Sequence, residues 1–305
     1  MDIVPTTLKI CIGICTYNEE NNITNLLENL FTKQNLPNDC MIVIVDSGST
    51  DATRYIVQKY MKRYKNLILL AQEKRQGKAS ALRLLFKYIE NKADVCVLVN
   101  ADALPDDNTI LKLIYPLERE RNIGAVASRP VPLSNPTRTA DALANLVWNL
   151  HHRISLSLPK LSGELCAIRT ALLPAIPKKL ATDEPYLEMV INKLAYKILY
   201  RPDIIVRIRT PSNLAEYLKH RTRIWTGHLQ LRNIWGYKVS TMTFTKVVYA
   251  LGCELIAQPK QILAALLGVF CEIIAYLIAR HALSKGEIPY IWEPLKTTKS
   301  RQTNR

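Results

Sequence analysis

MIVIVDSGSTD (residues 41–51) and VCVLVNADALPDD (residues 95–107) are apolar runs that each end on an acidic residue in a loop of small side chains. Asp46 closes the first run, and Asp102 follows the end of the second. Open α/β folds build sites for phosphate-bearing ligands at the carboxyl ends of their strands. TYNEE, residues 16–20, closes an earlier apolar run in the same way. Together the three endings predict a nucleotide site at one edge of a sheet.

The first 120 residues alternate between short β-branched runs and helical stretches. Strands separated by helices of this length predict βαβ units around a mostly parallel sheet, and continuously apolar strands are expected where helices cover both faces. After about residue 125 the alternation is lost, and Pro130, Pro132 and Pro136 predict a long irregular connection before a helix over 138–155. The expected strands are 8–15, 41–45, 67–70 and 95–99, and the expected helices are 20–33, 52–64, 78–91 and 109–120.

Composition limits the class of protein. A chain of 305 residues with 48% hydrophobic content can bury one large core, or a core plus a smaller annex. The net charge of +15 favours acidic partners, whether nucleic acid, anionic lipid or nucleotide phosphate. The seven cysteines form no C-x-x-C pair, which indicates a reduced, cytosolic compartment. No basic region precedes the first apolar run, so we expect no cleaved signal and a catalytic part inside the cell.

The apolar stretch 262–279 is just long enough to span a membrane and contains one charged residue, Glu272. A carboxylate near the centre argues against simple lipid exposure. From Arg280 onward there are six Lys or Arg against two Glu, and a single span would place them outside, against the positive-inside rule. We therefore expect a helix lying on the cytoplasmic surface, or a hairpin with 247–257 that turns at Pro259; a buried or dimer-forming helix is the alternative. Trp292 and Lys296 in the tail are typical of an interfacial anchor.

The residue types at the strand ends suggest roles. Asp102 can hold a divalent metal that neutralises charge on a nucleotide diphosphate, or it can be a turn or cap residue. Asp46 can accept a hydrogen bond from a base imide or a ribose hydroxyl, or serve a similar turn. Lys78 follows Gly77 at the first turn of a helix, where a cation is best explained by a bound phosphate. Asp183 and Glu184 supply adjacent carboxylates for a general base, or a simple helix N-terminus.

Seven motifs, in order, carry a resemblance to a known family. CTYNEENN, IVDSGSTD, QGKASALR, VNADALP, SGELCAIR, TDEPYLE and RTRIWTGH are similar to the motifs of family 2 inverting glycosyltransferases with the GT-A fold. The similarity covers roughly residues 8–230, and the most similar members are membrane-associated enzymes that build polysaccharides or glycolipids. The resemblance implies Mg²⁺ or Mn²⁺ on Asp102 and a base at Asp183 or Glu184. It further implies a nucleotide-sugar site of Thr16, Tyr17, Asn18, Glu19, Asp46, Lys78, Ala101, Asp102 and Arg223, and an acceptor side of Gly163, Glu164 and Trp225.

Three positions depart from the family pattern. The D-x-D motif is Asn100-Ala101-Asp102, so Asp102 alone is the expected metal ligand. The base motif reads Asp183-Glu184. Alignment with the family motif makes the second residue, Glu184, the general base, whereas residue type favours Asp183 as the base. We favour Glu184. The Q-x-x-R-W motif of processive members falls on His220, Arg223 and Ile224, with Trp225 displaced by one residue.

The predicted organisation is a catalytic domain over 1–235, with a nucleotide half at about 1–125 and an acceptor half at about 126–235. An apolar helical segment over 236–283 and a basic tail over 284–305 follow. The predicted activity is sugar transfer with inversion from a UDP-, GDP- or dTDP-sugar to a lipid-linked or glycan acceptor. We expect it at the cytoplasmic face of the cell membrane, without a nucleic-acid partner.

Two other classes of function fit the sequence less well. A nucleotidyltransferase should carry a glycine-rich basic loop after the first strand, whereas CTYNEENN has no glycine and two glutamates. A non-catalytic basic module for nucleic acid or membrane should interleave basic and aromatic residues, and aromatic residues are only 7% of the chain.

Overall fold

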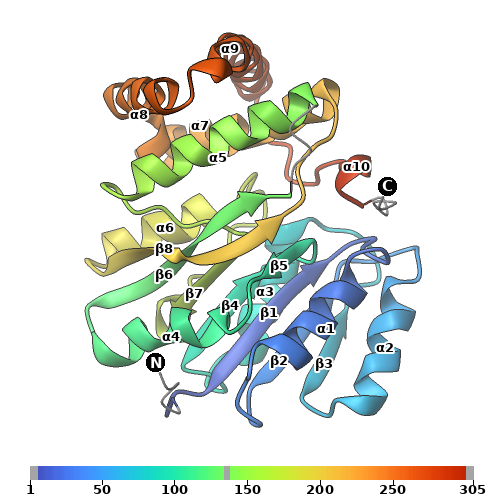
Figure 1. Ribbon diagram of the computed structural model, residues 1–305. Coiled ribbons are helices and arrows are strands. Elements are labelled where there is room, and N and C mark those ends of the chain that lie inside the picture. Colours follow the sequence, from blue (N-terminus) through green and yellow to red (C-terminus); the bar gives the residue numbers. More distant parts are fainter. Residues whose placement is uncertain (1–5, 134–137, 300–305) are drawn as a thin grey trace.

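The computed structural model describes residues 6–133 and 138–299, which form one curled sheet flanked by helices and capped by a further helical layer (Figure 1). Its strands follow the order β3-β2-β1-β4-β7-β6-β8-β5. The strands are β1 Ile10–Thr16, β2 Met41–Asp46, β3 Leu67–Ala71, β4 Val95–Val99, β5 Ala103–Pro105, β6 Ile123–Pro132, β7 Leu165–Arg169 and β8 Lys197–Ile208. The helices are α1 Ile23–Lys33, α2 Thr53–Arg63, α3 Lys78–Ile89, α4 Thr109–Arg119, α5 Thr139–Ser155, α6 Glu184–Lys193, α7 Leu214–Trp235, α8 Phe244–Ala257, α9 Ile262–Ser284 and α10 Lys296–Lys299, with 3₁₀ turns η1 Thr170–Leu172, η2 Ser240–Met242 and η3 Pro259–Gln261.

The predicted alternation of strands and helices is confirmed through residue 120, with element ends shifted by up to three residues. β1 pairs in parallel with β2 on one side and with β4 on the other, and Thr16 lies opposite Asp46. The chain thus moves outward from β1 through β2 to β3 and then returns to the opposite side of β1 as β4. Such a reversal leaves a crevice at the carboxyl ends of the two diverging strands, and open α/β sheets bind ligands there.

Both faces of the sheet are buried, which explains the continuously apolar strands. Ile12 and Ile14 point to the face covered by α1 and α4, while Cys11 points to the face covered by α3 and α6. Burying each large aliphatic side chain contributes roughly 1.5–3 kcal/mol. The sheet is therefore a rigid platform for the loops at its carboxyl edge.

The second half of the sheet is mixed, because β7 lies antiparallel between β4 and β6. Here the prediction of an irregular connection at Pro130 and Pro132 was wrong, since both belong to β6 and pair with β8. The N–H of Leu133 donates to Ile208 O of β8. Because successive N–H groups of a strand point to opposite sides, the nitrogens of Pro130 and Pro132 point away from β8. Pairing of β6 with β7 runs only from Ala125 to Ala127, and proline therefore removes no ladder hydrogen bond. Pro136 lies outside the described residues.

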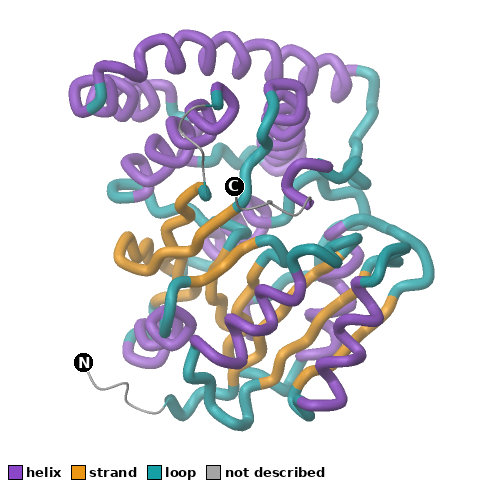
Figure 2. The backbone as a smooth tube through the Cα atoms, turned by 45° about the vertical axis from the view of Figure 1, so that its right-hand side comes forward, coloured by secondary structure: helices purple, strands orange, loops and turns teal. Residues whose placement is uncertain are grey.

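A helical layer of α5, α7, α8 and α9 covers one end of the molecule (Figures 1 and 2). The predicted turn at Pro259 is present as η3, and α8 and α9 both pack against α5. The long helix α9 runs lengthwise along α7, across the top of the view in Figure 2. α9 is the helix, among those described, that is long and apolar enough to cross a membrane.

The pattern of buried and exposed side chains on α9 is the reverse of that expected for a helix of a soluble protein, because its large apolar side chains are exposed. Its protein-facing side consists mainly of small residues, together with Leu267 and Tyr276, and Glu272 lies half-buried beside Arg221 and Trp225. Glu272 accepts hydrogen bonds from the Arg221 guanidinium and, at 2.8 Å, from the Trp225 indole. The carboxylate therefore faces the protein, as its position in an apolar run predicts. The buried side comprises Ala265, Gly268, Cys271, Ala275 and Ala279, and the exposed side comprises Leu263, Leu266, Phe270, Ile273, Leu277 and Ile278.

Candidate active site

A cavity of about 340 Å³ opens at the carboxyl ends of β1 and β4, in the crevice that the strand order creates. Residues from the loops after these strands line it, together with residues from α5, from α7 and from the segment that follows α9. Two groups of carboxylates face this cavity. One group lies at the start of α6, and the other lies around Asp102.

Lys78 holds the first group together. It is the first residue of α3, and its Nζ lies 3.0 Å from Asp183 Oδ2 and 2.8 Å from Glu184 Oε1. The same ammonium donates to Asn100 Oδ1 at 3.2 Å. Lys78 was predicted to meet a phosphate; here it is bound to the two candidate bases. The charge of the two adjacent carboxylates is compensated by the Lys78 ammonium, which the packing of α3 against the sheet keeps in place.

The two carboxylates of this pair have different environments. Asp183 precedes α6 and is 3% exposed, and burial together with the neighbouring Glu184 raises its pKa. Burial also acts to raise the pKa of Glu184, but the Lys78 ammonium, a backbone hydrogen bond and the charge of Arg223 together outweigh it and hold that pKa at about 2. Glu184 lies directly over Gly163, where an added Cβ would fall 1.6 Å from Oε1. Only glycine leaves room for the Glu184 carboxylate in this position.

Asn100 links the two groups of carboxylates. Its side-chain oxygen accepts from Lys78, and its Nδ2 donates to Glu164 Oε2 at 2.9 Å. An amide can accept and donate at once, whereas an ionised aspartate can only accept. This dual role is a physical reason for Asn at the position where the family pattern has Asp.

Asp102, Glu164 and Glu19 make up the second group. Burial raises the pKa of all three, and the charge of Asp102 further raises the pKa of Glu164 to about 7 and that of Glu19 to about 6. Lys299 opposes this rise at Asp102 and Glu19. Burial and the repulsion between these carboxylates both oppose their ionisation, and a further cation among them would favour it.

Asp46 is completely buried behind the cavity. Its carboxylate pairs with Arg54 and accepts from the backbone N–H of Ser49 at 3.1 Å and from Thr16 Oγ1 at 3.4 Å. Asn18, at φ 53°, accepts from the Thr50 N–H at 2.8 Å. Neither Asp46 nor Asn18 lines the cavity; both fasten the loop after β2 to the loop after β1.

The profile of Glycosyl transferase family 2 matches residues 11–170, slightly more than half of the chain. This match contains β1 to β7 and both strand ends that carry Asp46 and Asp102. The chain belongs to glycosyl transferase family 2.

Relatives of known name support this assignment. An N-acetylglucosaminyltransferase of Azorhizobium caulinodans is 22% identical over 245 residues, covering 73% of this chain and 60% of the relative. The probable glycosyltransferase YdaM of Bacillus subtilis is 24% identical over 234 residues, covering 72% of this chain and 55% of the relative. The chain thus spans little more than half the length of these relatives.

A solved structure supports the fold. The mannosyltransferase PcManGT from Pyrobaculum calidifontis, in complex with GDP-Man and Mn²⁺, superposes with a TM-score of 0.62. The two chains are 23% identical, and the match covers 93% of this chain and 86% of the other. The predicted mixed, mostly parallel GT-A sheet flanked by helices is confirmed.

Most predicted site residues of this family 2 glycosyltransferase line the cavity, whereas Asn18, Asp46 and Trp225 do not. Trp225 lies farther away, on the side of α7 that faces α9. Its Nε1 donates to Glu272, and its ring packs edge-on against Tyr276 of α9 with 5.2 Å between centroids. The structure places Trp225 between α7 and α9, away from the predicted acceptor side. The predicted residues that line the cavity are Thr16, Tyr17, Glu19, Lys78, Ala101, Asp102, Gly163, Glu164, Asp183, Glu184 and Arg223.

Several residues of the cavity were not predicted from the sequence, or were predicted to lie elsewhere. Arg75, for which the sequence analysis gave no role, lies over the Tyr17 ring with 4.1 Å to its centroid. Trp292, expected as an interfacial anchor, lines the cavity and donates to Ala181 O at 2.9 Å. Lys296, assigned to the same anchor, lies in α10 beside the cavity, and Lys299 lines it. The error has one cause: the chain turns back toward the sheet after α9, which no local pattern signals.

The carboxylates around Asp102 suit a divalent metal in part. Among the described residues, no three His, Cys, Asp or Glu side chains converge as a ready-made metal site. Mg²⁺ usually takes one or two protein carboxylates and completes its coordination with substrate phosphates and water. Asp102, which lies close enough to Glu19 and Glu164 for its charge to raise the pKa of both, fits that mode of binding.

Proposed function

We propose that this glycosyltransferase moves a sugar, with inversion, from a nucleotide-diphosphate donor to a lipid-linked or glycan acceptor. One observation carries the proposal: the Lys78-bound pair of Asp183 and Glu184 shares one cavity with Asp102 in a chain of this family. A base beside a phosphate- and metal-binding carboxylate is what such a transfer needs. The donor is a UDP-, GDP- or dTDP-sugar.

In the proposed reaction the acceptor hydroxyl oxygen attacks the anomeric carbon as the bond from that carbon to the diphosphate oxygen breaks. The hydroxyl proton goes to Glu184, which is ionised at neutral pH because of Lys78 and lies on the open side of the pair over Gly163. The nucleoside diphosphate leaves with the bonding electrons. Attack from the face opposite the leaving group inverts the configuration.

The leaving group is doubly anionic, and cationic groups around the cavity support its binding. Arg223 lines the cavity, and its Nε is buried without a hydrogen-bond partner among the described residues. A buried unpaired donor costs about 1–3 kcal/mol, which a phosphate oxygen would recover. Mg²⁺ or Mn²⁺ held by Asp102 would neutralise charge on the leaving diphosphate when bound.

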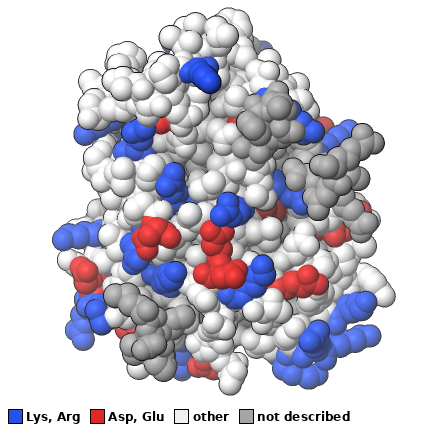
Figure 3. All heavy atoms as spheres, in the orientation of Figure 1, with Lys and Arg blue, Asp and Glu red and all other residues white. Residues whose placement is uncertain are grey.

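We further propose that the outer face of α8 and α9 lies on a membrane. On α9 the large side chains are exposed and the small ones are buried, and Phe244, Tyr249 and Ile256 of α8 are also exposed. The upper surface in Figure 3, over these helices, is almost free of charged side chains. A helix packed along α7 with one apolar side outward suits an interfacial position better than a single span. The free thiols favour the cytoplasmic face.

The decisive experiment is donor hydrolysis with UDP-, GDP- and dTDP-sugars in Mn²⁺, comparing wild type with Asp102→Ala. We expect metal-dependent turnover of one donor and its loss in the variant. Asp107→Ala is the matched control, since its carboxylate is 70% exposed and it lies beyond β5 from Asp102, outside the cavity lining. Absence of binding and turnover with every donor would reject the proposed enzyme, and equal losses in the two variants would reject the role of Asp102.

A further inference from the structure

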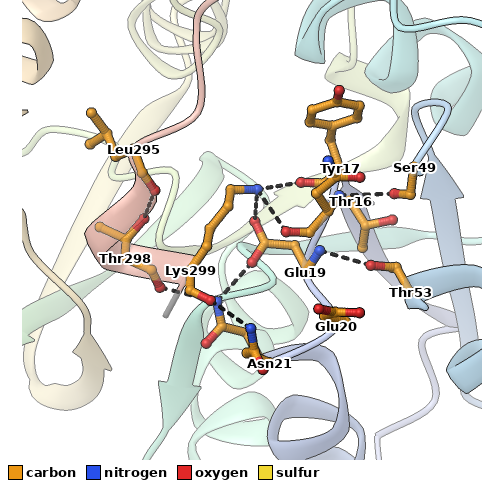
Figure 4. A network of polar contacts seen from close by, with 12 residues as sticks. Thr16, Tyr17, Glu19, Glu20, Asn21, Ser49, Thr53, Leu295, Thr298 and Lys299 are labelled. Atoms are coloured by element: carbon orange, nitrogen blue, oxygen red, sulfur yellow. Dashed lines mark hydrogen bonds and ion pairs between the residues drawn. The ribbon is translucent and has the colours of Figure 1, made fainter. Parts of the chain in front are cut away.

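The segment after α9 crosses one side of the cavity and places Lys299 among the residues predicted to bind the nucleotide. Lys299 Nζ donates to the carbonyl oxygens of Tyr17 and Asn18 and lies 2.7 Å from Glu19 Oε1 (Figure 4). Asn21 and Asn22 donate to the backbone carbonyls of Lys299 and Thr298. The ammonium thus satisfies the acceptors that a ribose or a base would otherwise use.

The same segment is tied to the opposite wall of the cavity. Glu216 of α7 accepts from the backbone N–H of Lys296 at 3.1 Å and from the N–H and hydroxyl of Thr297. The Thr297 hydroxyl also accepts from the Ser212 N–H at 3.1 Å. The segment is therefore a strap between α7 and the loop after β1.

The middle of the strap closes on the α3 side of the cavity. Arg75 donates to Trp292 O, and a Cβ added to Gly77 would lie 2.6 Å from Tyr290 O. With the strap in place the cavity is about 340 Å³, at the small end of the roughly 300–1,000 Å³ that drug-sized ligands occupy. A nucleotide sugar is a large member of that class, so the strap takes up room the donor needs.

We propose that residues 287–299 form a displaceable strap that competes with the nucleotide donor, with Lys299 holding Glu19 and the Tyr17 carbonyl until the donor arrives. The inference rests on the proposed donor site. The strap is held by polar contacts and contributes no residue to the hydrophobic clusters on the two faces of the sheet, so it can leave without disturbing the sheet. The donor must then bind tightly enough to break those contacts, and the affinity measured for the whole chain is reduced accordingly.

The test is isothermal titration of UDP, GDP and dTDP, each with Mn²⁺, into the full-length wild type and variants. Lys299→Met removes the competing cation, and nucleotide binding should tighten by about tenfold. The strap then loses its hydrogen bonds from a charged group, which are the strongest of those that hold it in place. Thr297→Val removes the hydroxyl between Ser212 and Glu216, outside the donor contacts, and should tighten binding in the same direction. Lys296→Met is the matched control, because its exposed side chain belongs to the same short helix and does not line the cavity.

Hydrogen exchange of residues 290–299 gives the second readout. Faster exchange in the presence of nucleotide is expected if the strap is displaced, and slower exchange would show that it closes on the donor instead and would overturn the proposal. Weaker binding by Lys299→Met would make Lys299 a donor ligand and overturn the competition. Equal affinities in wild type, Lys299→Met and Thr297→Val would reject the strap while leaving the sugar-transfer proposal standing. No binding by any of these proteins would reject both.

Discussion

Two lysines bind carboxylates on opposite sides of one cavity, and they differ in how the chain holds them. Lys78 starts α3, whose Leu82, Leu85 and Ile89 are packed into the sheet, and it bridges Asp183 and Glu184. Lys299 belongs to the strap, which adds no residue to the hydrophobic clusters of the sheet, and binds Glu19. The chemistry of the two ion pairs is alike. A cation on a helix packed into the core sets the charge of a site permanently, whereas we expect a cation on a segment outside the core to be exchanged for a ligand.

The largest expected effect is on kcat, at the proposed base Glu184, which is bound by Lys78. Glu184→Gln keeps the shape of the side chain but removes its ability to accept a proton, and kcat should fall by about 10²–10⁴-fold. Asp183→Asn should cost less, because Asp183 is almost fully buried behind Glu184. Single-turnover rates with the donor found in the screen measure both. A larger loss in Asp183→Asn would reverse the assignment of the base.

Gly163→Ala tests whether the position of the Glu184 carboxylate matters. The new Cβ would fall 1.6 Å from Glu184 Oε1, so that carboxylate must move. A displacement of about 1 Å from productive geometry costs about 10²-fold in rate. Gly252→Ala in α8 is the control, since no atom lies within 4 Å of its added Cβ. Unchanged kcat in a folded Gly163→Ala variant would contradict the assigned position of the base.

Lys78→Met tests the permanent cation through pH. Burial acts to raise the pKa of Glu184, and Lys78, with a backbone hydrogen bond and Arg223, outweighs it to give a value of about 2. Without Lys78 only the backbone hydrogen bond and Arg223 oppose burial, so the pKa of Glu184 should rise. A base with a raised pKa is protonated earlier as pH falls, and the acidic limb of the kcat profile should move to higher pH. Lys74→Met, on the exposed part of the preceding loop, should leave that limb unchanged; an unmoved limb in Lys78→Met would refute the electrostatic role.

The smallest expected effect concerns the outer face of α9, from which the strap departs. Phe270→Glu places a charge where a side chain 61% exposed is proposed to meet lipid. Loss of one buried aromatic side chain should weaken binding to anionic vesicles by about tenfold. Vesicle sedimentation measures it, with Tyr55→Glu on α2, 70% exposed and outside the proposed face, as control. Equal binding of Phe270→Glu and wild type would reject the membrane-facing surface.

Much of the nucleotide half was predictable, because its signals are local. Strand and helix periods placed β1 to β4 and α1 to α4 within a few residues, and the carboxyl ends of parallel strands necessarily meet at one edge. The same logic brought Tyr17 and Asp102 to one cavity. It also placed Asp46 at the end of β2, but it did not predict that Asp46 would be buried and paired with Arg54 of the following helix.

The sequence by itself determined the α/β class, the order of elements and which residue types reach the carboxyl edge, since backbone propensity and hydrophobic period act over a few residues. Only the tertiary structure decided the partners. Lys78 meets Glu184 across 106 positions and Lys299 meets Glu19 across 280, and the small-residue side of α9 was assigned to the protein only by its packing on α5 and α7. Electrostatic pairing and packing depend on distance in space, and chain position does not specify that distance until the sheet and its cap are assembled.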